Sequence, residues 1–230
     1  MLALVVAPIF GVSGWYLGLT ANIACVVYAA VLVTVRRQWR TSGILVAWRG
    51  PGAAVILLVL VAEVLAWAVP AGLENRPPGF GMWALTLLLV GINEELTSRV
   101  VVLERLRQAF GPYAAVALTA ALFGLQHLSA FATTSRDAVD VAGNVVVSAC
   151  TGFALAAFQY RYRWLTPLIL VHAAADFTAI LALRPLGDGV IALTAVGFVV
   201  LGHVTLLWRG GAGRRAAPPP VESASLADFH

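Results

Sequence analysis

The sequence predicts an all-helical bundle of membrane spans, and three observations lead to this fold class: the apolar composition, the long apolar runs and the placing of the arginines. Of the 230 residues, 60% are hydrophobic and 11% are charged, and the mean hydropathy is +0.88. An ordinary soluble domain carries about 25% charged residues, and a globule of this size could not bury so much apolar surface. The apolar excess also excludes a disordered chain. An integral membrane protein is therefore predicted.

Seven apolar segments are each long enough to cross a hydrocarbon core of about 30 Å as a helix. They lie near residues 17–35, 53–70, 81–103, 112–130, 139–160, 165–183 and 190–208. The runs are continuous, whereas the strands of a membrane β-barrel alternate over about 10 residues, so we expect a transmembrane helical bundle with seven clear spans. Residues 1–13 are apolar but short and contain Pro8, which leaves an eighth span at the N-terminus open.

The arginines predict the orientation of these spans. All fifteen basic residues are Arg, and eleven fall on one side, against three on the other, if the loop after the first span is cytoplasmic. The cytoplasmic set is Arg36, Arg37, Arg40, Arg49, Arg105, Arg107, Arg161, Arg163, Arg209, Arg214 and Arg215, and the external set is Arg76, Arg136 and Arg184. Such a bias is typical of cytoplasmic loops and needs no nucleic-acid partner. We therefore expect a multi-pass protein of the cell membrane, with a membrane domain over 1–208 and a disordered cytoplasmic tail over 209–230.

Costly polar side chains interrupt the third, fourth and sixth predicted spans. Ionisable groups in a hydrocarbon core usually face a cavity or a partner. Glu95 and Arg99 are four residues apart, so they share one helix face and predict an internal ion pair. Glu94 points about 100° away from that face. His172 and Asp176 are also four residues apart, so we expect them to present two polar groups to the interior of the bundle.

The fourth span contributes His127, and Phe123 lies one turn before it as a wall for the imidazole ring. Two imidazoles and a carboxylate suit the activation of water: Glu94 could take a proton from water as a general base, with His127 and His172 beside it. The same three side chains could instead ligate zinc and leave one position for water. No HExxH motif is present to favour the metal, so both chemistries stay open.

Three motifs, in order along the chain, carry a resemblance to a known family. They are Glu94-Glu95-x-x-x-Arg99, Phe123-x-x-x-His127 and His172-x-x-x-Asp176. In order and separation they resemble the motifs of the CPBP intramembrane protease family, the CAAX-protease and bacteriocin-processing family that is also called the Abi family. The resemblance covers about residues 81–183 and leaves the first two spans and the tail outside it.

The resemblance implies hydrolysis of peptide bonds within the membrane by a metalloprotease or a metal-free, glutamate-dependent enzyme. By position, Glu94 matches the family's water-activating glutamate, and His127 matches its partner in holding that water. His172 and the residue at position 176 match the pair that stabilises the tetrahedral oxyanion. Glu95 and Arg99 match the supporting positions of the first motif.

Asp176 departs from the pattern of many relatives, which have Asn at this position. An amide can donate a hydrogen bond to an oxyanion, whereas an ionised carboxylate only accepts. We therefore expect Asp176 to orient His172 or to bind a metal, unless it is protonated.

The predicted function is an intramembrane endopeptidase that acts on a membrane-associated protein or a peptide precursor. Two alternatives stay open. One is a non-catalytic immunity or scaffold protein that keeps the motifs as structure. The other, less favoured because no inverted repeat is visible, is an ion-coupled transporter that uses the glutamate and the two histidines as a relay. Glu63, in the second span, is interpreted as a packing residue or an accessory group.

Overall fold

The protein is described by a computed structural model over residues 6–70 and 72–208, in which every named element is helical. The longer helices are α2 (Trp15–Val35), α4 (Pro51–Ala68), α5 (Phe80–Glu95), α7 (Pro112–Gln126), α9 (Ala138–Tyr162), α10 (Leu165–Leu181) and α11 (Asp188–Leu207). The shorter ones are η1 (Ala7–Phe10), α3 (Trp39–Ser42), η2 (Leu96–Val102), α6 (Leu103–Ala109), η3 (His127–Ser129) and α8 (Ala130–Thr133). The all-helical class is confirmed, and the predicted tail lies outside the described residues.

Local sequence signals explain where several helices begin. Pro51 and Pro112 stand in the first turns of α4 and α7, where the missing N–H of proline costs no hydrogen bond. Asp137 precedes α9, and its side chain accepts a hydrogen bond of 2.8 Å from the backbone N–H of Asp140, which satisfies one of the free donors of the first turn.

Four helices are long and apolar enough to cross a membrane, namely α2, α4, α9 and α11. The apolar helix α10 has 17 residues, and α5 and α7 have 16 and 15. A multi-pass membrane protein is supported, but the prediction of seven clear spans is not confirmed. Helix α5 continues without a break through η2 and α6, so one helix extends from Phe80 to Ala109. Near the N-terminus the described residues form η1, of four residues, which is too short for an eighth span.

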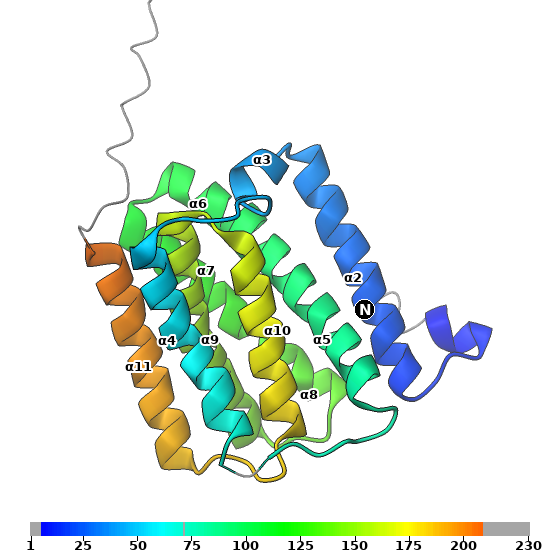
Figure 1. Ribbon diagram of the computed structural model, residues 1–230. Helices are drawn as coiled ribbons and strands as arrows, with labels where there is room; N and C mark the ends of the chain where they lie inside the picture. Colours follow the sequence, from blue (N-terminus) through cyan, green and yellow to red (C-terminus); the bar gives the residue numbers. More distant parts are fainter. Residues whose placement is uncertain (1–5, 71, 209–230) are drawn as a thin grey trace, which may run out of the picture.

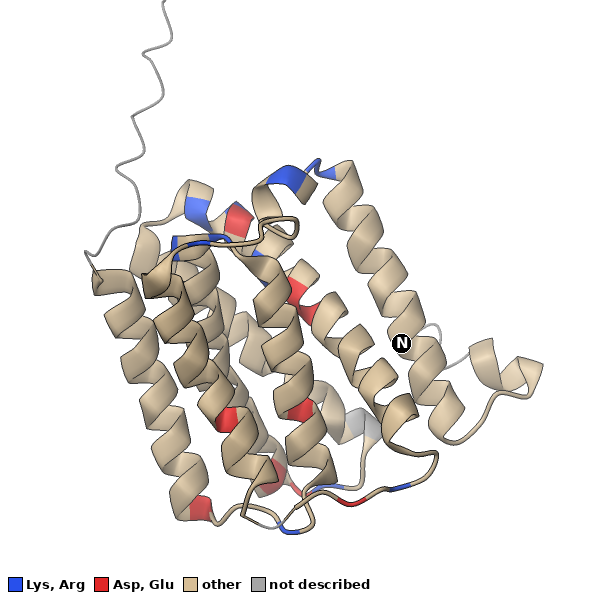
Figure 2. Ribbon diagram, viewed as in Figure 1, with Lys and Arg blue, Asp and Glu red and all other residues tan. Residues whose placement is uncertain are grey.

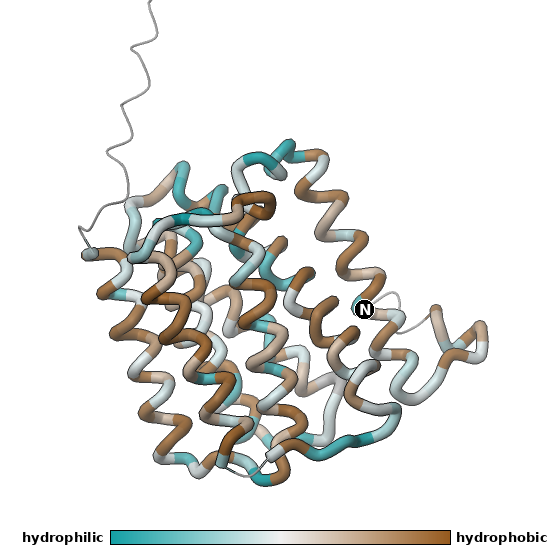
Figure 3. The backbone as a smooth tube through the Cα atoms, viewed as in Figure 1, coloured by the Kyte–Doolittle hydropathy of each residue, from teal (hydrophilic) through white to brown (hydrophobic). Residues whose placement is uncertain are grey.

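Helix α9 is the most buried of these four helices and α2 is the most peripheral (Figure 1). α9 packs against α7 and α11, α10 packs against α4 and α5, and α2 packs against α5. In the most apolar window of α9, 44% of the residues are buried, against 11% in α2. Val27 and Val31 of α2 are exposed, and apolar segments run along the outside of the bundle (Figure 3). An exposed apolar surface of this extent matches a lipid environment rather than water.

Charged residues lie mostly at the two ends of the bundle. Basic residues gather at the end that holds α3 and α6, whereas acidic residues of α4, α5 and α10 lie between the ends (Figure 2). The loop after α3 is fixed to the α9–α10 turn at the basic end: Trp164 Nε1 donates to the backbone oxygen of Val46 at 2.7 Å, and Arg49 donates to that of Arg163 at 3.0 Å. Hydrogen bonds thus hold the loop at the basic end in place. The acidic groups between the two ends are the candidates for a functional site.

Candidate active site

Glu95 joins the first and third motifs across two helices. One carboxylate oxygen, Oε1, accepts a hydrogen bond of 2.9 Å from Nδ1 of His172 on α10. The other, Oε2, lies 3.4 Å from Nε of Arg99, and both of these side chains are completely buried. The ion pair expected from the spacing of Glu95 and Arg99 is therefore present. Glu95 also fixes the imidazole of His172, a contact that the spacing did not reveal.

The other ring nitrogen of His172 faces two further carboxylates. Nε2 lies 3.6 Å from Oε2 of Glu94 and 3.6 Å from Oδ2 of Asp176. The side chains of Glu94 and Asp176 are 19% and 36% exposed, in contrast to the buried Glu95. Since Nδ1 is occupied by Glu95, Nε2 is the atom of His172 that can meet a reacting group.

His127 reaches the site from the end of α7. Its Nδ1–H donates to the backbone oxygen of Phe123 at 3.0 Å, which leaves Nε2 as an acceptor when the ring is neutral. It lies within electrostatic range of Glu94 and Asp176. Among the described residues, no direct hydrogen bond joins His127 to Glu94. Catalytic hydrogen bonds are often long in structures without substrate, so the lack of a direct bond does not exclude the pair from acting together.

Phe123 separates the two imidazoles and covers the buried arginine. Its ring centroid lies 5.4 Å from that of His127 and 5.8 Å from that of His172, with edge-to-face geometry in both pairs. The guanidinium carbon of Arg99 lies 4.2 Å from the centroid, within the range of a cation–π contact. The expected contact between Phe123 and His127 is therefore present. The same ring also contacts Arg99 of the first motif and His172 of the third.

Two glycines allow the close packing around the site. A Cβ at Gly91 on α5 would lie 3.0 Å from the backbone oxygen of Ile169 and 3.4 Å from the Cβ of Ala173, so α5 and α10 approach closely there. A Cβ at Gly152 on α9 would lie 2.8 Å from the ring of Phe123, closer than carbon atoms pack. Small residues at such crossings let helix backbones and large rings fit together in membrane proteins.

A π-helical segment, η2, follows Glu95 directly and contains Arg99. Such widened turns are rare and occur often at functional sites. The sequence does not predict this π-helical segment. Apart from three successive valines, the residues Leu96–Val102 look like those of an ordinary α-helix.

Glu63 on α4 takes part in the electrostatics of the same site. It lies on the helix face that includes Ile56 and Leu60, which pack into the core with residues of α10, and it interacts electrostatically with Asp176 and His172. The choice between a packing residue and an accessory group for Glu63 therefore stays open.

The zinc hypothesis needs several donors around one point. Among the described residues, no group of three or more His, Cys, Asp or Glu side chains is placed to hold a metal ion. Glu94, His127 and His172 as placed do not fit a zinc site, and zinc stays a prediction that metal analysis of the purified protein would test.

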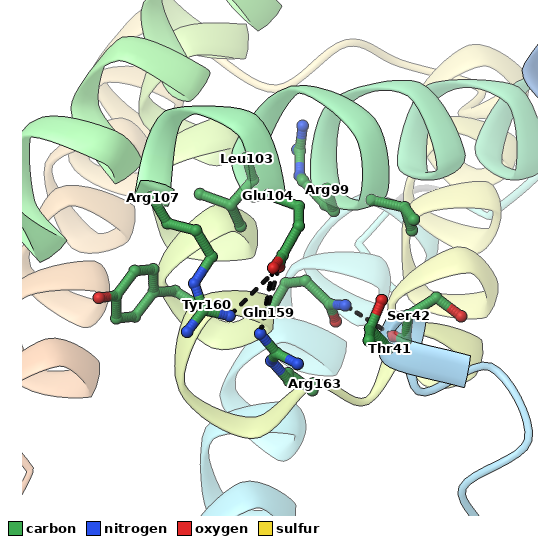
Figure 4. Close-up of a pocket in the computed structure, with 10 residues that line it drawn as sticks. Thr41, Ser42, Arg99, Leu103, Glu104, Arg107, Gln159, Tyr160 and Arg163 are labelled. Atoms are coloured by element: carbon green, nitrogen blue, oxygen red, sulfur yellow. Dashed lines mark hydrogen bonds and ion pairs between the residues drawn. The ribbon is translucent and has the colours of Figure 1, made fainter. Parts of the chain in front are cut away.

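A second polar cluster lies at the basic end, around Glu104 on α6 (Figure 4). Its carboxylate is 3.2 Å from Arg107 on the same helix and 3.2 Å from Arg163 at the end of α9. Beside it, Gln159 donates to the backbone oxygen of Ser42 at 2.7 Å. These residues line a cavity of about 10 Å³, the size of a single water. The cluster ties α3, α6 and α9 together, and none of the three sequence motifs except Arg99 contributes to its lining.

The fold and the first cluster together define a class: a multi-pass helical membrane protein with two histidines and three carboxylates gathered inside the bundle. Residues 76–178 match the family described as type II CAAX prenyl endopeptidase Rce1-like. The match includes all three motifs, confirms the resemblance to the CAAX-protease family and supports a protease. No curated protein and no solved structure matches the chain.

Proposed function

We propose that the protein is an intramembrane endopeptidase in which Glu94 activates water. The observation that carries the proposal is the arrangement around His172: Nδ1 is held by Glu95 at 2.9 Å, while Nε2 stands 3.6 Å from Glu94 and from Asp176. One imidazole is thus fixed in orientation and directed at the two partly exposed carboxylates. A fixed histidine beside a free carboxylate is the arrangement that acid–base hydrolysis requires.

The first step is the attack of water on the carbonyl carbon of the substrate. Water is held between the carboxylate of Glu94 and Nε2 of His127, whose Nδ1–H is engaged with Phe123. Glu94 takes one proton from the water, and the oxygen forms a bond to the carbonyl carbon as the C=O electron pair moves onto oxygen. General-base assistance of this kind contributes about 10²–10⁴-fold to the rate.

The second step is the collapse of the tetrahedral intermediate. The negative oxygen is stabilised by Nε2–H of His172, which donates when the ring carries both protons and its charge is balanced by Glu95. The carbonyl re-forms, the C–N bond breaks, and the proton on Glu94 passes to the leaving nitrogen. Glu94 is then ready to activate a new water.

Asp176 orients the imidazolium of His172 in this mechanism. Its oxygen lies 3.6 Å from Nε2, so it serves as a counter-charge rather than as a donor to the oxyanion. The scheme uses only this chain's own side chains and the substrate water.

The substrate is a membrane-associated protein or peptide precursor. The site residues lie on α5, η3 and α10, inside a bundle that includes four helices apolar enough to span a bilayer, so the scissile bond must enter from the membrane or its surface. In this proposal the protein lies in the cell membrane. The basic end, which holds α3 and α6, faces the cytoplasm because arginines are enriched in cytoplasmic loops.

The test compares the wild type with Glu94→Gln in proteoliposomes. Both are incubated with a quenched, membrane-anchored peptide library, products are identified by mass spectrometry, and metal content is measured on the same samples. We expect the variant to lose at least about 100-fold in kcat. The matched control is Glu104→Gln, which removes a glutamate of the same continuous helix outside the site and should change kcat less than about twofold.

The two alternatives predict different outcomes in the same vesicles. A scaffold or immunity protein would be identified by two results. The folded wild type would cut neither the library nor its natural partners, and the variant Glu94→Gln would protect cells as well as the wild type does. Ion flux that is lost on substitution of His127 would identify a transporter.

A further inference from the structure

A second cavity lies at the basic end, between the end of α2 and the helix that carries Glu94 and Glu95. Its volume is about 360 Å³, in the range of small-molecule sites. It is lined mainly by Arg36, Gln38, Val101, Val102, Arg105 and Leu106. None of these residues belongs to the three motifs, and the proposed hydrolysis does not use them.

The polar lining of this cavity carries unbalanced positive charge. Within the described part of the chain, neither Arg36 nor Arg105 forms an ion pair with a carboxylate; Arg105 donates only to the neutral amide oxygen of Gln108, at 3.3 Å. In contrast, Arg107 and Arg163 at the same end share Glu104. Two guanidinium groups from separate helices at one cavity match a phosphate, which accepts several charged hydrogen bonds.

The remaining lining residues add one more requirement on a ligand. Val101, Val102 and Leu106 give an apolar part to the same cavity. A ligand that satisfies both features carries a phosphate and an apolar chain.

The place of the cavity in the molecule selects the source of that ligand. It adjoins α2, whose outer side is exposed and apolar, at the end of the bundle where the basic residues gather (Figure 2). This is the level of the lipid headgroups, where basic pockets between helices bind anionic lipids. A soluble phosphate would leave the apolar part uncovered.

We propose that this cavity binds an anionic phospholipid, with Arg36 and Arg105 on its phosphate and its apolar chain against Val101, Val102 and Leu106. The lipid bridges α2 to η2, since Val101 and Val102 belong to η2 and Arg36 follows the last residue of α2. It thereby supports the continuous helix that carries Glu94.

Native mass spectrometry of the purified, delipidated full chain tests the proposal. Phosphatidylglycerol and phosphatidylcholine are titrated separately, and bound lipid is counted. We expect one tightly bound phosphatidylglycerol and no comparable phosphatidylcholine. The double variant Arg36→Gln/Arg105→Gln should lower the affinity for phosphatidylglycerol about 30-fold, because each basic residue near anionic lipid contributes about fivefold.

The matched control removes the same two charges from the same end of the molecule. Arg37 and Arg40 are exposed and do not line the cavity, so Arg37→Gln/Arg40→Gln should bind phosphatidylglycerol like the wild type. Equal weakening in both double variants would show diffuse attraction and overturn the proposal. Wild-type affinity in the Arg36/Arg105 variant, or equal competition by soluble glycerol phosphate, would also overturn it. The readout is binding, so it does not depend on whether the protein is a protease.

Discussion

Two ionic clusters lie within this bundle, and their difference in burial and charge is the reason for proposing chemistry at only one of them. The cluster around Glu104 joins one carboxylate to two arginines, and its side chains are 16–26% exposed. The cluster around Glu95 joins three carboxylates to one arginine and a histidine, and its central ion pair is completely buried. An ion pair near water contributes little to stability, and its charges lose little hydration. A buried group with excess carboxylate is expensive, and here it retains two partly exposed acids beside a fixed imidazole.

The largest contrast should appear in stability when each central glutamate loses its charge. Glu95→Gln leaves the guanidinium of Arg99 buried without its counter-charge, and breaking a buried pair in this way costs about 3–5 kcal/mol. Glu104→Gln leaves two arginines that reach water, and the loss should be about 1 kcal/mol or less. Thermal unfolding in detergent, followed by circular dichroism, measures both variants against the wild type.

Equal losses of stability in the two variants would contradict this distinction, because both clusters would then stabilise the fold to a similar degree. The double variant Glu95→Leu/Arg99→Met sharpens the distinction. Removing both charges should recover much of the stability, as is found for buried pairs replaced by apolar residues. Leucine cannot accept the hydrogen bond from Nδ1 of His172, so the fixed orientation of His172 and the activity should not recover.

A smaller effect is expected from the packing that supports the cluster around Glu95. Gly152→Ala forces the ring of Phe123 to move, because the new Cβ would lie 2.8 Å from that ring. We expect a loss of about 1–3 kcal/mol in stability and a clear fall in kcat, since the ring separates the two imidazoles. Gly143→Ala on the same helix is the matched control, because a Cβ there meets nothing within 4 Å. An unchanged kcat in Gly152→Ala would show that the position of Phe123 does not matter for the reaction.

The sequence predicts much of this site because its spacings are local. Residues four apart on one helix share a face, which was enough to predict the pair of Glu95 and Arg99 and the ring of Phe123 beside His127. The contact between Glu95 and His172 depends on how α5 packs against α10, and no spacing within one helix contains that information. The same holds for Glu63, whose relevance comes from the packing of α4 on α10.

The spans were harder to predict than the class of the fold. Hydropathy marks apolar runs, but helix ends depend on turns and tertiary contacts. The predicted span 112–130 is helical throughout, but it tightens from α7 into the 3-10 turn η3 at His127 and continues as α8 to Thr133. Nδ1 of His127 bonds the carbonyl of Phe123 one turn back. Hydropathy does not detect this local change in the type of helix.

The smallest expected effect concerns Asp176, at the edge of the cluster around Glu95. Asp176→Asn removes a negative charge that repels the developing oxyanion and adds an amide donor in its place. Because the same change also removes a counter-charge of His172, whose Nε2 is 3.6 Å away, the two effects oppose each other. We expect a net rise in kcat of about tenfold or less, since a single oxyanion donor is worth at most about 10²–10³-fold. Steady-state kinetics on the peptide that the wild type cuts measures it, with Asp176→Ala as the control that loses both functions and should be slower than the wild type. A 100-fold fall in Asp176→Asn, as large as that expected for Glu94→Gln, would instead make Asp176 an essential carboxylate and extend the catalytic acids of this site from one to two.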